Sequence, residues 1–230
     1  MGLFVIADTH LSFGTSKPMD VFSGWNGYVD KIKEHWEYIV SPDDTVVIAG
    51  DISWGMSLLE AKPDFEFLHN LPGQKILLKG NHDYWFDTKN KFDKLISESG
   101  FNTLKMLHNN AYEYEDYSIC GTRGWLSEIK STSDNNKKIT TREAGRLRMS
   151  LEAGKNFGKQ PIAFLHYPPI YSTFEMTEIT DVLKEFGVKK CFYGHLHGHA
   201  HKGAVNGIID GVEYALVSCD FTQFSPVKIC

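Results

Sequence analysis

Short apolar segments recur along this chain of 230 residues, and the intervals between several of them are long enough to hold a helix. Each segment has four or five residues and is rich in β-branched, leucine or aromatic side chains, which predicts buried strands. The predicted strands are Leu3 to Ala7, Thr45 to Ala49, Lys75 to Lys79, Tyr117 to Cys120, Pro161 to Leu165, Lys189 to Tyr193 and Tyr214 to Ser218. This pattern restricts the chain to the α/β class.

Apolar residues between these segments fall at helical spacing. Tyr28, Ile32 and Trp36 repeat every four residues and predict a helix with one apolar face. Ser57 followed by Glu60 is the pattern of a capping box at the start of a second helix. Two more helices are predicted, one around Phe92, Leu95 and Ile96, and one that begins near Thr140 or Thr141 and carries Ala144, Leu147 and Leu151.

The two halves of the chain differ in their order of elements. The first half alternates strand and helix three times, whereas the second half has more strands and fewer helices. This difference favours an α/β sandwich with mixed sheets over a purely parallel, doubly wound sheet. No internal repeat or linker is visible, so residues 1–230 are expected to form a single domain. The long polar stretch from Ser127 to Lys138 is predicted to be a surface loop, with a lid beside a site as the alternative.

Charge and hydropathy restrict the partners and the location. With 24 basic and 29 acidic residues, the formal net charge is −5, whereas a general nucleic-acid binder more often has a basic surplus. No apolar stretch is long enough to span a bilayer, so no membrane insertion is expected. The first residues run directly into a predicted strand without a signal peptide, and the four cysteines form no CxxC pair. A cytoplasmic protein with reduced thiols is therefore expected.

Several predicted strands end in residues that bind metals. These ends are Asp8-Thr9-His10, Gly50-Asp51, Gly80-Asn81-His82-Asp83, His166 and Gly194-His195-Leu196-His197. Such strand ends converge at one edge of an α/β sheet, and the preceding glycines permit a close approach of the backbone. A carboxylate, imidazole and amide set without thiolate favours Mn, Fe, Zn, Co or Ni over a structural zinc site. The set is larger than one ion would use, which predicts two divalent ions that share a carboxylate, as in phosphoryl transfer.

These five motifs, in this order, resemble those of the calcineurin-like metallophosphoesterase superfamily. Any one of them occurs by chance, but together they are specific, and they extend from residue 8 to residue 197. The resemblance implies a four-layer α-β-β-α sandwich with two mixed β-sheets.

The resemblance also implies roles for individual residues. The residues in the ligand positions are Asp8, His10 and His197 for the first ion and Asn81, His166 and His195 for the second, with Asp51 bridging the two. His82 is in the position of the catalytic histidine, which lies close to the ions and donates to the phosphate or protonates the leaving oxygen.

One position departs from the superfamily. Many members, protein phosphatases especially, read GDxxD, and the second aspartate pairs with the catalytic histidine. Trp54 stands at that position here, so the partner of His82 is open, with Asp83 as its neighbour in sequence. The departure argues against a protein phosphatase and favours the smaller phosphodiesterase-like members.

Other residues near the predicted strand ends have two possible roles each. Arg123 could bind a substrate phosphate bidentately or form a surface ion pair. The aromatic residues Trp25, Trp54, Tyr84, Trp85, Phe86 and Trp125 could line a pocket, although packing between loops and sheet is the commoner role. The basic residues Lys137, Lys138, Arg142, Arg146 and Arg148 predict a solvated helix face, with a patch facing the substrate as the alternative.

Together these features predict a dinuclear-metal-dependent phosphohydrolase in which a metal-bridging hydroxide attacks a small phosphate ester, a phosphodiester in preference to a monoester. Manganese is the expected ion, with Fe, Zn, Ni, Co or Mg as alternatives. One alternative function is a catalytically silent scaffold on the same fold, which would be expected to have lost ligands. Another is a nuclease, with nucleic acid as its partner, which the basic residues support. The sequence contains no signal for the oligomeric state.

Overall fold

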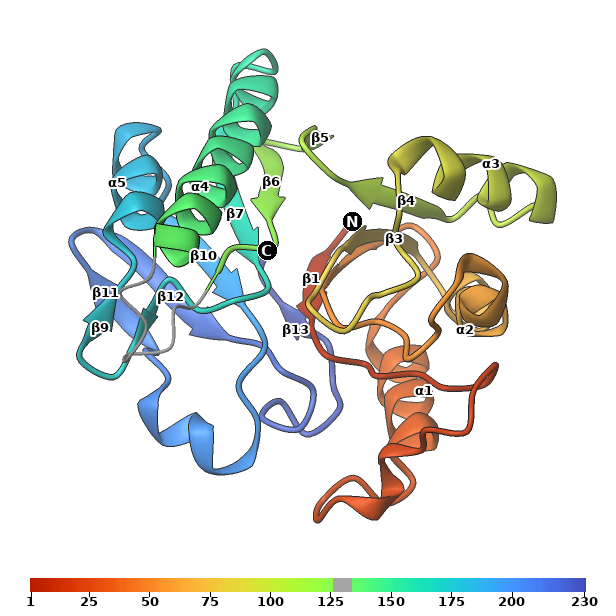
Figure 1. Ribbon diagram of the computed structural model, residues 1–230. Coiled ribbons are helices and arrows are strands. Elements are labelled where there is room, and N and C mark those ends of the chain that lie inside the picture. Colours follow the sequence, from red (N-terminus) through yellow and green to blue (C-terminus); the bar gives the residue numbers. More distant parts are fainter. Residues whose placement is uncertain (126–133) are drawn as a thin grey trace.

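The computed structural model describes residues 1–125 and 134–230. Two large sheets lie between two sets of helices (Figure 1). The first sheet has the strand order β13-β1-β2-β3-β4. Its strands are β1 (Leu3–Ile6), β2 (Thr45–Ala49), β3 (Gln74–Leu78), β4 (Leu104–Leu107) and β13 (Val227–Lys228).

The second sheet has the strand order β11-β12-β10-β7-β6-β5. Its strands are β5 (Tyr112–Tyr114), β6 (Tyr117–Thr122), β7 (Gln160–Leu165), β10 (Lys190–Tyr193), β11 (Gly207–Ile209) and β12 (Val212–Leu216), and a separate hairpin pairs β8 (Ile170–Tyr171) with β9 (Phe174–Glu175). The inner strands of both sheets are parallel. The edge strands β13, β11 and β5 are antiparallel to their neighbours, so both sheets are mixed, as predicted.

Alternate residues of each strand enter different cores, because successive side chains of a strand point to opposite faces. In β1, Val5 packs between the two sheets, whereas Phe4 and Ile6 pack against the helices outside the first sheet. In β7, Phe164 faces the space between the sheets, and Leu165 faces the helices outside the second sheet. Three cores between four layers confirm the α-β-β-α sandwich.

One outer layer of helices comes from the N-terminal half of the chain, and the other comes from the C-terminal half (Figure 1). The helices are α1 (Tyr28–Ile39), α2 (Leu58–Asn70) and α3 (Lys89–Ser99) outside the first sheet and α4 (Asp134–Lys155) and α5 (Thr177–Glu185) outside the second, with short 3-10 helices at Met19–Val21 and Gly198–Gly203. Ser57 caps α2 as predicted, since its side chain accepts a hydrogen bond from the Glu60 N–H. The Glu60 carboxylate bonds to the Met56 N–H. Among the described residues, no helix combines the length and apolar character needed to cross a membrane.

Some predicted boundaries were wrong. Residues 134–138 of the predicted loop are already helical, several residues before Thr140, as part of α4, and residues 127–133 lie outside the described part. The polar composition of residues 134–138 hid their helical character in the sequence. Helix α5 and strand β4 were not predicted from the sequence, because a segment of nine residues and one of four contain too little periodicity to be distinguished from loops.

Candidate metal centre

The predicted metal ligands follow strand ends in both sheets. Asp8 follows β1 and Asp51 follows β2, whereas His166 follows β7 and His195 follows β10. The sheets meet at this end, because the backbone N–H and carbonyl of Ala7 form hydrogen bonds of 2.8 and 2.9 Å with the segment after β12. Residues almost 200 positions apart in the sequence therefore surround one site.

The site contains two groups of potential ligands. Asp8, His10 and His197 form one group, and Asp51, His166 and His195 form the other; within each group the ligand atoms lie within 4.8 Å of one another. The Asp51 carboxylate lies between the groups, with Oδ2 3.8 Å from His10 Nε2 and Oδ1 3.5 Å from His166 Nε2. Asn81 Oδ1 lies 2.7 Å from His166 Nε2. All seven residues that the sequence suggested as ligands lie together.

The backbone is strained at these positions. Asp8, His10, Asp51 and His195 have φ values of 61°, 43°, 51° and 72°. Non-glycine residues rarely adopt this left-handed region, at a cost of about 1–3 kcal/mol each, and such strain concentrates at functional sites. The strain turns four side chains out of the strand direction and toward a common point.

Two glycines allow the loops to meet. A Cβ atom at Gly80 would lie 2.1 Å from Asp51 Oδ1, and a Cβ atom at Gly194 would lie 2.5 Å from Asp8 Oδ2. Any side chain at either position would displace an aspartate of the site. Close backbone approach, which the sequence suggested for these glycines, is therefore a steric requirement.

The donor set fits divalent cations. Asp8 and Asp51 are buried, with 0% and 1% exposure. Within residues 1–125 and 134–230, no lysine or arginine forms an ion pair with either carboxylate; the side chains within ion-pairing distance of them are histidines. Buried carboxylates need a counter-charge, and His10 Nδ1 is buried without a hydrogen-bond partner among the residues that the structure describes. A site of carboxylate and imidazole donors without a fixed cation is suited to metal ions.

The protonation of the metal-free site follows from burial and mutual contacts. Burial lowers the pKa of His10 and of His195 to about 3, so both are neutral at pH 7, the form that binds metals. Burial, reinforced by the Asp8 charge, raises the pKa of Asp51 to about 8. Burial opposes the charge of His197, but Asp8 and Asp220 outweigh it and raise its pKa to about 10. A metal ion must therefore displace protons from Asp51 and His197.

Two carboxylates outside the ligand groups shape the site. Asp220 Oδ1 lies 2.9 Å from His197 Nδ1, which fixes the ring and leaves Nε2 directed at Asp8, 3.5 Å away. Asp83 is fully buried and accepts hydrogen bonds from the Ile52 and Gly80 N–H groups and from Trp85 Nε1. Sequence reasoning missed Asp220, because it follows β12 in no recognisable motif.

Asp83 does not orient His82, because its carboxylate is directed at the backbone of the Asp51 and Gly80 loops. His82 Nδ1 is buried without a hydrogen-bond partner among the described residues. Its ring instead packs against Trp54, with centroids 4.6 Å apart. Trp54 also stacks on His10 at 4.9 Å. Trp54, which stands at the second aspartate position of the GDxxD pattern, therefore contacts His82 through its indole ring.

A cavity of about 450 Å³ opens over the centre. Its lining includes polar groups such as Asp51, His82 and Asp220 and the apolar residues Met19, Phe22, Trp25 and Trp54. Trp25 and Trp54 thus line this cavity, whereas Trp85 is buried in the core between the first sheet and its outer helices. Arg123 lines a separate, neighbouring cavity and contacts Glu143.

Comparisons with known proteins agree with this geometry. The chain matches the family described as calcineurin-like phosphoesterase over residues 1–199. A search of curated proteins found no significant match. Similar solved structures include a phosphopantetheinyl hydrolase from Mycobacterium tuberculosis, 13% identical with a TM-score of 0.60, over 99% of this chain and 95% of that chain. A protein of unknown function from Aquifex aeolicus is 14% identical with a TM-score of 0.53, over 99% and 95%. A Thermus thermophilus protein is 9% identical with a TM-score of 0.57, over 99% and 97%.

At these identities the structural likeness shows the fold alone. The family match covers most of the chain and includes every residue of both ligand groups. The chain therefore belongs to the calcineurin-like phosphoesterase family, as a metal-dependent phosphoesterase.

Proposed function

We propose that this chain hydrolyses a small phosphate ester, a phosphodiester in preference to a monoester, at a centre of two divalent ions, with manganese as the preferred metal. The observation that carries the proposal is the position of Asp51, whose two carboxylate oxygens face one histidine from each ligand group. A carboxylate placed in this way can serve both ions.

The proposed ligands follow the two groups. Asp8, His10 and His197 hold the first ion, Asn81, His166 and His195 hold the second, and Asp51 is shared. When bound, two such ions supply a hydroxide nucleophile at neutral pH and offset charge on the phosphoryl oxygens. Asp220 keeps His197 in its binding orientation through the bond to Nδ1.

His82 is the proposed catalytic histidine. Its backbone N–H donates to Asp51 Oδ1 at 2.8 Å, which holds the residue beside the ligand groups. Because Nδ1 is buried, Nε2 is the nitrogen proposed to meet substrate. Burial and the nearby His166 lower the pKa of His82, which favours a neutral ring whose N–H donates to a phosphoryl oxygen or to the leaving oxygen.

The preference for a diester rests on the shape of the cavity. A diester carries a second organic group, and that group needs a surface beside the polar centre. Met19, Phe22, Trp25 and Trp54 contribute apolar surface to the lining, and a cavity of about 450 Å³ lies within the usual range for small-molecule sites.

The test is hydrolysis of bis(p-nitrophenyl) phosphate and p-nitrophenyl phosphate after chelation, with Mn, Fe, Ni, Co, Zn or Mg returned singly. We expect turnover to return with metal, most with Mn, and to be higher for the diester. Asp51→Asn should lower kcat/KM by at least about 100-fold, because several kcal/mol of charge stabilisation depend on the metals. His82→Ala should lower kcat by about 100-fold or more.

Retained activity in Asp51→Asn would contradict the shared-ligand role. Absence of turnover with every metal, in a protein that still binds metals, would overturn the hydrolase proposal and favour a scaffold function. Asp93→Asn, on the exposed side of α3, is a charge-matched control that should retain turnover.

A further inference from the structure

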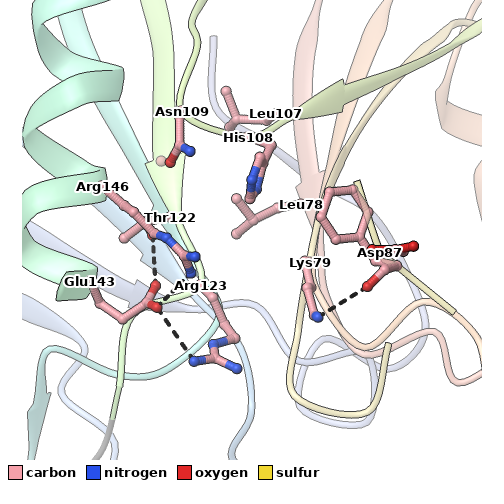
Figure 2. Close-up of a pocket in the computed structure, with 12 residues that line it drawn as sticks. Leu78, Lys79, Asp87, Leu107, His108, Asn109, Thr122, Arg123, Glu143 and Arg146 are labelled. Atoms are coloured by element: carbon pink, nitrogen blue, oxygen red, sulfur yellow. Dashed lines mark hydrogen bonds and ion pairs between the residues drawn. The ribbon is translucent and has the colours of Figure 1, made fainter. Parts of the chain in front are cut away.

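A second cavity lies beside the metal centre, in the seam between the two sheets (Figure 2). Residues at or just beyond the carboxyl ends of β3, β4 and β6 form its walls, and α4 closes one side. Its volume is about 140 Å³. Sites for whole small molecules usually have about 300–1,000 Å³, so this cavity suits one chemical group of a larger ligand.

The cavity contains more cations than carboxylates. Lys79 extends from one wall, and Arg123 and Arg146 extend from the other (Figure 2). Glu143, which is fully buried, lies 2.8 Å from Arg146 and 3.4 Å from Arg123. Asp87 also lines the cavity.

These carboxylates do not balance the cations. Asp87 pairs with Lys91 outside the cavity. Among the described residues, no carboxylate forms an ion pair with Lys79, whose ammonium makes a long hydrogen bond of 3.4 Å to the Phe86 carbonyl and lies 5.4 Å from the centre of the Phe86 ring. Glu143 is shared by Arg123, Arg146 and the outer Arg142. Three cations against two carboxylates give the lining a net charge of +1, and the pairing of Asp87 with Lys91 increases the uncompensated positive charge in the cavity, which an anion would stabilise.

The arginine geometry also leaves donors available. Arg123 Nε is buried without a hydrogen-bond partner in the described part of the chain, and its terminal nitrogen makes only a 3.4 Å contact with Glu143. A guanidinium presents a planar set of donors that matches the oxygens of a phosphoryl group. A cavity with an arginine that lacks a full set of partners on one wall and an unpaired ammonium on the other is suited to such a group.

The cavity is close to the proposed catalytic centre. Lys79 precedes Asn81 by two residues, so their Cα atoms lie within about 7 Å. On the opposite wall, the Arg123 carbonyl accepts hydrogen bonds from the His166 and Tyr167 N–H groups at 3.1 and 2.9 Å. Both walls are thus connected directly to proposed metal ligands.

We propose that this cavity binds a phosphoryl group through Lys79, Arg123 and Arg146. This inference rests on the proposed function, and it implies that the substrate carries a second phosphoryl group near the scissile one, as in a diphosphate-linked ester. The metal centre would hold the scissile group, and the cavity would select substrates by the second.

The binding test uses metal-free protein in chelator, so that neither the metals nor turnover contributes. Inorganic phosphate and diphosphate are titrated by calorimetry at constant ionic strength. We expect one saturable site, with diphosphate affinity weakened roughly tenfold or more in Lys79→Met and in Arg146→Gln, because each substitution removes a charge-assisted contact. Lys94→Met removes an equal charge from the exposed face of α3 and should leave the affinity unchanged.

Two variants are needed because removal of Arg146 leaves the buried Glu143 of the same helix with fewer partners, whereas Lys79 pairs with no carboxylate in the described part of the chain. Equal diphosphate affinity in the folded Lys79→Met variant and in the unmodified protein would overturn the proposal. The proposal would also be overturned if Lys94→Met weakened diphosphate binding as much as Lys79→Met does, since the binding would then reflect general attraction to positive charge.

The turnover test uses the metal-loaded protein with bis(p-nitrophenyl) phosphate and bis(p-nitrophenyl) diphosphate. We expect the diphosphate to have the higher kcat/KM, and Lys79→Met and Arg146→Gln to reduce the ratio of the two values by about tenfold. A ratio unaffected by both substitutions would refute the substrate class while leaving the hydrolase proposal intact. Diphosphate binding that depends on Lys79 and Arg146, without hydrolysis of either ester, would support the phosphoryl site and overturn the proposed function instead.

Discussion

At the scale of single residues, the position of the His82 ring depends on its contact with the indole of Trp54. Trp54 packs against His82 and also stacks on His10, while His82 Nδ1 has no hydrogen-bond partner among the described residues. A ring that is held by packing alone has fewer fixed contacts than one paired with a carboxylate. Trp54 is therefore a positioning residue for the proposed catalytic histidine.

Replacing Trp54 should impair catalysis more than metal binding. We expect Trp54→Ala to lower kcat for bis(p-nitrophenyl) phosphate by about tenfold, part of the contribution of a positioned acid or donor. Trp54→Phe should restore most of the loss, because an aromatic face remains against His82. Metal content is measured in parallel by elemental analysis. If metal content falls in proportion to kcat, the substitution acts through metal binding at His10 instead. If Trp54→Phe does not restore kcat, packing against His82 is not the cause.

At the scale of elements, α2 is connected to the metal-site loops by a buried aspartate. Asp64 Oδ1 accepts a 2.7 Å hydrogen bond from the Phe13 N–H, and Oδ2 accepts one from the Ser53 hydroxyl. Burial raises the pKa of Asp64 to about 6, and the nearby Asp83 adds to the rise. The folded protein therefore binds this proton more tightly than the unfolded chain does.

The sign of the pH effect follows from that difference. The stabilising contribution is fully present below the unfolded pKa of about 4 and is lost as the pH rises through about 6. Asp64→Asn cannot titrate at this position. Between pH 4 and pH 7, the free energy of unfolding of the unmodified protein should fall by about 2–3 kcal/mol relative to that of Asp64→Asn.

Urea unfolding of both metal-free proteins at the two pH values measures this change. Using metal-free protein prevents acid release of metal from contributing to the difference. The exposed Asp93→Asn control should show a change below about 1 kcal/mol. If the free energy of unfolding of the unmodified protein stays constant or rises with pH relative to that of Asp64→Asn, Asp64 is charged and compensated in the folded state.

At the scale of the whole molecule, the two sheets contribute to one metal centre. Asp8, Asp51 and Asn81 follow strands of the first sheet, and His166, His195 and His197 follow strands of the second. Ions bound by both sets would link the sheets, and this arrangement does not exist in the unfolded chain. Metal binding should therefore stabilise the fold as a whole.

Thermal unfolding measures this linkage. At a metal concentration about 100 times Kd, each bound ion adds about 2.7 kcal/mol to the free energy of unfolding, which raises Tm by roughly 5–10 °C per ion for a chain of this size. Asp51→Asn, with the shared ligand weakened, should show a clearly smaller rise. An identical Tm in chelator and in excess Mn would mean that the sheets are not linked through metal.

The sequence by itself determined the α/β class, the inner strands and the proposed ligands. These features are local, because a buried strand is recognisable from five consecutive residues, Asp8 and His166 each stand directly after one, and Asp51 stands one residue further on. The family resemblance added the four-layer arrangement, which the three cores confirm.

Only the tertiary structure decided what surrounds those ligands. The contact of Asp220 with His197, the packing of Trp54 on His82 and the turning of Asp83 away from that ring depend on how loops from two sheets meet. The cationic cavity likewise combines Lys79 from the end of β3 with Arg146 from α4, which are 67 positions apart in the sequence. Such contacts are set by the relative positions of packed layers, and no short-range pattern in the sequence specifies them.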